Sequence, residues 1–84
     1  MIYIPQTLHW QWHDFRGWKC AACDHDFKAY VKIRISGHVA IEFELHDGVA
    51  VAKYRFGNGS VYDAQLWAER NFRYVRASLK DDIL

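Results

Sequence analysis

The clearest pattern of hydrophobic and polar positions runs from Phe27 to Ile35. A period of two residues is typical of a strand with one buried face. The pattern therefore predicts a strand whose apolar side faces the core. Its inward positions are Phe27, Ala29, Val31, Ile33 and Ile35, and its outward positions are Lys28, Tyr30, Lys32 and Arg34.

Two further strands are predicted after this one, over residues 39–45 and 49–56. Gly37-His38 suits a two-residue hairpin turn between the first two strands, and residues 46–48 suit the next turn. The second strand sends Val39, Ile41, Phe43 and Leu45 inward and Glu42 and Glu44 outward. The third sends Ala50, Ala52, Tyr54 and Phe56 inward and Lys53 and Arg55 outward, leaving Val49 and Val51 outside unless a bulge intervenes.

The outward charges predict the order of the strands. The first and third strands carry basic residues, whereas the second carries Glu42 and Glu44. Because opposite charges on neighbouring strands favour pairing, the acidic strand belongs in the middle. We interpret this outer side as a solvated face with compensated charges.

A helix is predicted to begin at Ser60, after the glycines of residues 57–59 break the sheet. Ser60 and Asp63 have the spacing of a capping box, with aspartate in place of the usual glutamate. We expect the helix to end near Lys80, with residues 81–84 frayed. At about 100° per residue, one apolar stripe collects Val61, Ala64, Ala68, Phe72, Val75 and Leu79.

The first 26 residues admit more than one interpretation. Leu8, Trp10 and Trp12 alternate with polar residues, which predicts a strand over residues 8–13, with a helix over residues 8–15 as the alternative. A turn at 14–17, a returning strand at 18–20 and a loop to Asp26 would follow. Residues 1–5 are consistent with a short edge strand that ends at Pro5.

These elements predict a single small α+β domain over residues 1–84. It consists of an aromatic-rich N-terminal segment (1–26), a three-stranded antiparallel β-meander (27–56) and one C-terminal α-helix (60–80) packed against the meander. N-terminal strands would extend the sheet.

Composition narrows the function classes. The chain has 84 residues, a formal net charge of +1 and 17% aromatic residues. Such a charge argues against a protein that coats nucleic acid by charge alone, and a core this small leaves some aromatic side chains for the surface. We expect neither a signal peptide nor a membrane span, and hence a cytoplasmic location.

Cys20 and Cys23 form a Cys-x-x-Cys pair near His9, His13 and His25. Residues 17–27 resemble one knuckle of a zinc ribbon, which implies two zinc ligands from the cysteines. The second Cys-x-x-Cys of that family is absent from this chain. We therefore expect two reduced, partly buried thiols and no metal or other cofactor, with zinc bound by these cysteines and His13 or His25 as the alternative.

Catalytic motifs are missing from the sequence. It contains no Gly-x-Ser-x-Gly elbow, no His-Glu-x-x-His and no phosphate-cradling glycine loop. We therefore predict that the protein is not an enzyme and has no catalytic residues.

Nucleic-acid binding is the alternative function. Residues 25–37, with residues 57–64 and Ala68, resemble the strand and final helix of a double-stranded RNA-binding domain. The resemblance implies phosphate contacts at the start of the helix, but Val61, Tyr62 and Asp63 stand there instead of lysines. A basic stripe toward the helix C-terminus offers a second route to nucleic acid, although it also suits the helix dipole. The stripe consists of Arg70, Arg73, Arg76 and Lys80.

The preferred hypothesis is a protein-binding helix face. Exposed Trp, Tyr and Arg have the composition of an interface hot spot, and the candidate residues are Leu66, Trp67, Arg70, Arg73 and Tyr74. The alternative for Trp67 and Tyr74 is packing beneath the N-terminal segment. In size and layout the chain resembles the small inhibitors that phages encode against host defence complexes, including anti-CRISPR proteins. The resemblance implies a non-enzymatic protein that docks on a macromolecular protein partner.

Overall fold

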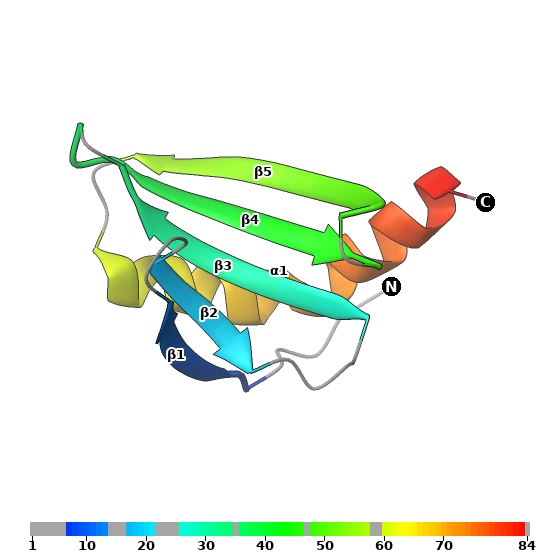
Figure 1. Cartoon of the computed structure of the whole chain (residues 1–84), viewed down its shortest axis with the longest axis horizontal. Coiled ribbons are helices and arrows are strands. Elements are labelled where there is room, and N and C mark those ends of the chain that lie inside the picture. Colours follow the sequence, from blue (N-terminus) through cyan, green and yellow to red (C-terminus); the bar gives the residue numbers. More distant parts are fainter. Residues whose placement is uncertain are drawn as a thin grey trace.

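The computed structural model describes residues 7–13, 17–21, 26–34, 36–46, 48–57 and 60–83. Each strand in this part of the chain pairs antiparallel with the next, in the sheet order β1-β2-β3-β4-β5. The predicted α+β fold is therefore confirmed: an antiparallel meander, extended by N-terminal strands, packs against one C-terminal helix (Figure 1). The elements are β1 (His9–His13), β2 (Gly17–Ala21), β3 (Phe27–Ile33), β4 (Val39–Leu45), β5 (Ala50–Gly57) and α1 (Val61–Ile83).

The N-terminal segment contributes strands rather than a helix. β1 pairs with β2 along its whole length, so the strand prediction is confirmed and the helix alternative is wrong for residues 9–13. β2 joins the meander with Trp18 opposite Val31. The strand predicted at residues 1–5 and most of the turn predicted at 14–17 lie outside the described residues.

The β3–β4 hairpin turns at Arg34, earlier than predicted. The N–H of Gly37 donates to the Arg34 carbonyl over 2.8 Å, and the N–H of Arg34 donates to the His38 carbonyl over 2.9 Å. Gly37 has a φ of 86°, a left-handed conformation that glycine adopts without a Cβ penalty. Gly37 therefore closes a turn that starts at Arg34 and does not form a two-residue turn with His38.

β4 lies between β3 and β5, as the charges predict. Val49, just before β5, is 72% exposed, and Val51, within β5, is 40% exposed. Both therefore lie outside, as expected. A bulge is present at the other end of the strand, where Ala40 faces Arg55 but Val39 faces Gly57.

The helix begins where its cap predicts and continues past its expected end. The N–H of Asp63 donates to the Ser60 hydroxyl oxygen over 3.1 Å, which satisfies one of the unpaired donors of the first turn. α1 continues to Ile83, so the end predicted near Lys80 is wrong. Residues 81–83 contain neither glycine nor proline, which would stop the helix.

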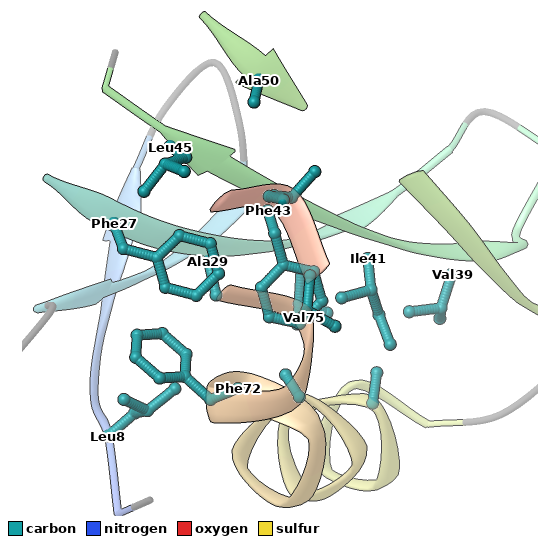
Figure 2. Packing of buried hydrophobic residues seen from close by; sticks show 14 residues of the cluster. Leu8, Phe27, Ala29, Val39, Ile41, Phe43, Leu45, Ala50, Phe72 and Val75 are labelled. Atoms are coloured by element: carbon teal, nitrogen blue, oxygen red, sulfur yellow. The ribbon is translucent and has the colours of Figure 1, made fainter. Parts of the chain in front are cut away.

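The core forms between α1 and one face of the sheet. Phe27 from β3, Phe43 from β4 and Phe72 from α1 meet at its centre, with ring centroids 4.7 Å apart for Phe27–Phe72 and 5.7 Å apart for Phe27–Phe43. Leu8 lies beside Phe72, so the N-terminal segment also covers the core (Figure 2). The predicted helix stripe faces this core, with Val61 half-buried at its start and the other members buried.

Ile33 departs from the predicted inward face, because it is 57% exposed. In the described register β2 pairs with β3 only at Tyr30 and Val31. Among the described residues, Ile33 therefore has a neighbouring strand on the β4 side alone, and its alternating position does not bury it.

Among the described residues, no helix combines the length and the apolar character needed to cross a membrane.

Candidate binding surfaces

Trp67 lies at the boundary between α1 and the edge strand β5. Its ring centroid is 5.1 Å from that of Tyr54 and 6.4 Å from that of Phe43, and the residue is half-buried. Trp67 is therefore packed, as the alternative to a protein-binding role predicts. It packs against β5, however, and not beneath the N-terminal segment.

The N-terminal segment lies on the opposite flank of the helix. The backbone N–H of Leu8 donates to Glu69 Oε2 over 2.9 Å, and the indole N–H of Trp10 donates to the same oxygen over 3.4 Å. Glu69 thus holds the start of the described chain against one side of α1. The side that carries Trp67 is not covered by the described N-terminal residues.

The structure divides the predicted helix face into two groups. Arg70 and Tyr74 follow Trp67 at helical spacings of three and seven residues, so these three residues form one strip along the flank. Arg70 is exposed, and Tyr74 is 54% exposed. Leu66, which is half-buried, and Arg73, which is exposed, lie further round, on the side of α1 away from the sheet.

Tyr54 belongs to the same surface, although sequence analysis assigned it only to the core. It is 37% exposed, and its ring contacts both Phe43 and Trp67. Its place on the last strand of the meander was the signal, because the last strand of a meander lies at a sheet edge. We call Tyr54, Trp67, Arg70 and Tyr74 together the edge flank.

The basic stripe predicted toward the helix C-terminus is interrupted at Arg76. The Arg76 guanidinium lies 3.9 Å from the Asp26 carboxylate, which is also 3.8 Å from the ring of His46. Arg76 and Lys80 are half-buried, whereas Arg70 and Arg73 are exposed. A continuous solvated stripe of four basic residues is therefore wrong, because Arg76 turns toward the sheet.

The outer side of the sheet is less solvated than predicted. Glu42 and Glu44 on β4 are each only 8% exposed, and Tyr30, directly opposite Glu42 on β3, is 5% exposed. Lys32 Nζ lies 2.8 Å from Glu42 Oε2 and neutralises it. Long side chains from the flanking strands cover the shorter ones of the central strand. The compensated pair is therefore present, with Glu42 buried and Lys32 half-buried.

The ion pair determines the charge state of Glu42. Burial alone would raise the pKa of this carboxyl by disfavouring its charged form. The hydrogen bond and positive charge of Lys32 outweigh burial, with smaller contributions from a hydrogen bond with Glu44 and from the charge of Lys53. Together they hold the pKa of Glu42 below its ordinary value. Glu42 is therefore ionised at neutral pH, and its negative charge compensates the positive charge of Lys32.

The zinc alternative involves the histidines of β1 and the cysteine pair that follows β1 in the sequence. His9 and His13 lie at the two ends of β1, four positions apart. Along a strand this spacing is roughly 13 Å, too far for the two residues to share one ion. Cys23 and His25 lie outside the described residues. No cluster of three or more metal-ligating side chains occurs in the described ranges.

No family model, curated protein or solved structure matches the chain. Two surfaces therefore carry the functional argument. One is the edge flank, and the other is the outer side of the sheet near Arg34 and Arg55, which are exposed and form no ion pair with a described residue.

Proposed function

We propose that the chain is a non-enzymatic protein-binding domain and that the edge flank is its docking surface. The observation that carries the proposal is the position of exposed aromatic side chains beside a sheet edge. Tyr54 and Tyr74 are exposed there, and Trp67 supports Tyr54 from the helix. Aromatic residues with arginine are the side chains that most often dominate binding energy at interfaces.

The edge strand supports the same proposal. In the described sheet β5 pairs with β4 alone, so its other edge offers backbone donors and acceptors to an added strand. An extended segment of a partner can pair with such an edge while its side chains contact the neighbouring surface. The edge flank lies beside this strand and would receive those side chains.

The charges favour an acidic partner segment. Arg70 and Lys53 are both exposed and form no ion pair with a described residue. We therefore propose an extended, acidic segment of a protein as the occupant. Inhibition of a host defence complex is one function that such docking would serve.

Mutagenesis on the helix tests the surface. The immobilised protein is exposed to cell lysate with and without nuclease, and washed at low and high salt. We expect one discrete protein to be retained in all four conditions, because aromatic anchors are less salt-sensitive than phosphate contacts. Tyr74→Ala and Arg70→Ala should each reduce retention about tenfold, the effect of a hot-spot residue.

Tyr62→Ala is the matched control, because Tyr62 is 66% exposed on the same helix but lies off the edge flank. Its retention should equal that of the unmodified chain. Equal retention by Tyr74→Ala and Arg70→Ala would show that the docking surface is elsewhere. Material retained only without nuclease and lost in high salt would instead support the nucleic-acid alternative.

A further inference from the structure

A cleft of about 480 Å³ opens where the β3–β4 hairpin meets the end of β5. Its volume falls within the range of small-molecule sites. Figure 1 places this hairpin at the opposite end of the molecule from the C-terminus of α1. The lining residues are Arg34, Ser36, His38, Val39, Ala40, Arg55 and Gly57.

The cleft contains two arginines without a countercharge. Arg34 and Arg55 are exposed, and neither side chain forms an ion pair or hydrogen bond within the described part of the chain. Lys32 differs, because Glu42 neutralises it at 2.8 Å. No carboxylate is among the lining residues of the cleft, so its electrostatic preference is for an anion.

The floor of the cleft is a small residue between long basic ones. Ala40 on β4 lies directly opposite Lys32 on β3 and Arg55 on β5. Its methyl group is short, so the flanking basic side chains can extend above it without a central side chain between them. Glu42, two residues further along the same face of β4, marks where the compensated part of this face begins.

The hairpin adds neutral donors on a fixed backbone. Ser36 Oγ lies 2.9 Å from His38 Nδ1. When the hydroxyl donates to Nδ1, the ring keeps its proton on Nε2 and can donate it to a ligand. The backbone hydrogen bond from Arg34 to His38 fixes the two ends of this turn relative to each other.

We propose that this cleft binds a phosphate group, either free or carried on a small molecule. The planar guanidinium groups of Arg34 and Arg55 match phosphate oxygens in bidentate geometry, and His38 supplies a further donor. This site is separate from the edge flank and does not depend on the proposed docking function.

Amide resonances of the full chain provide the direct test. Inorganic phosphate, a nucleoside 5′-monophosphate and a short single-stranded oligonucleotide are each titrated at low salt, with acetate as the carboxylate control. We expect phosphate to shift the amides of Gly37, His38 and Ala40 saturably and acetate to leave them nearly unchanged. Arg34→Gln and Arg55→Gln should each weaken binding about tenfold, the effect of losing one charge-assisted hydrogen bond.

Lys80→Gln is the control for a lost positive charge, because Lys80 lies in the last turns of α1, away from the cleft. It should bind phosphate as the unmodified chain does, and amide dispersion should confirm that every variant is folded.

The three phosphate probes identify the source of the ligand. Equal affinity per phosphate for all three supports a free phosphate, and tighter binding of the monophosphate supports a small phosphate ester. An oligonucleotide that binds far more tightly, and loses affinity steeply with salt, assigns the phosphates to a nucleic acid and overturns the small-ligand proposal. The proposal is also overturned if no phosphate probe gives a saturable shift, or if shifts persist in the Arg34→Gln/Arg55→Gln double variant.

Discussion

The two sides of the central strand β4 are both buried, but neighbours of different kinds cover them. Ile41, Phe43 and Leu45 face α1 and are at most 1% exposed. Glu42 and Glu44 face the other way and are each 8% exposed, although the helix lies across the opposite face (Figure 1). A packed apolar layer buries one side of β4, and side chains of the flanking strands bury the other.

The comparison separates charges that stabilise the fold from charges that do not. At the middle of the outer face, Glu42 and Lys32 form a close pair with limited access to water. Toward the hairpin, Arg34 and Arg55 are exposed and have no countercharge among the described residues. The first pair has a structural explanation in burial, whereas the two arginines have none.

The largest effect is expected on the helix side of β4. Phe43 is fully buried and its ring contacts those of Phe27, Phe72 and Trp67. Phe43→Ala removes these contacts and leaves a cavity, so it should lower the free energy of unfolding by about 3–5 kcal/mol. Urea denaturation measures this loss.

Two milder variants are compared with Phe43→Ala. Phe43→Leu keeps most of the apolar volume and should lose less, which keeps the test informative if Phe43→Ala does not fold. Val49→Ala, at a 72% exposed position, should stay within about 0.5 kcal/mol of the unmodified chain. A loss below about 1 kcal/mol for Phe43→Ala would contradict the central place given to this ring.

The helix side could be predicted from the sequence because its signals are local. The alternation at Phe27, Ala29 and Val31 and the stripe through Ala64 to Leu79 each lie within one element, and the chain buries these residues as the period indicates. The capping residue Ser60 acts within one helical turn. Such patterns need no knowledge of the neighbouring element.

The outer side could not be predicted in the same way, because its burial depends on register between strands. Glu42 is covered through its position beside Tyr30 and Lys32 on β3, which the alternation of β4 does not reveal. The partner of Trp67 also depends on tertiary structure. A helical projection shows two flanks, but the direction in which α1 crosses the sheet decides which flank meets Tyr54 on β5.

An intermediate loss of stability is expected when the Lys32–Glu42 pair is broken. Lys32→Met leaves a buried carboxylate without its partner, which should cost about 1–2 kcal/mol at pH 7, allowing for the partial exposure of Lys32. The pKa of Glu42 is lowered in the folded chain, so the stability from this pair is present above the unfolded-state pKa. It is lost as pH falls through the folded-state pKa.

The measurement is urea denaturation of the unmodified chain and of the Lys32→Met variant between pH 7 and pH 3. The difference between them should be full at neutral pH and shrink in the acidic range as Glu42 becomes protonated. Lys53→Met is the control, because Lys53 influences Glu42 by charge without a close ion pair, and it should lose less than Lys32→Met. A stability difference that stays constant over the whole pH range would refute the ionic explanation.

The smallest effect on stability is expected from substitution of the two cleft arginines. The Arg34→Gln/Arg55→Gln double variant removes two exposed cations that line one cleft. Because no described group compensates them, the free energy of unfolding should change by less than about 0.5 kcal/mol, or rise slightly as repulsion is relieved. The measurement is urea denaturation at low salt, where repulsion between like charges is least screened.

A loss above about 1 kcal/mol would give these arginines a structural role like that of Lys32. An unchanged or increased stability, together with lost phosphate binding, would show that the charged residues of the outer face have two different roles. Lys32 and Glu42 stabilise the sheet, and Arg34 and Arg55 bind a ligand.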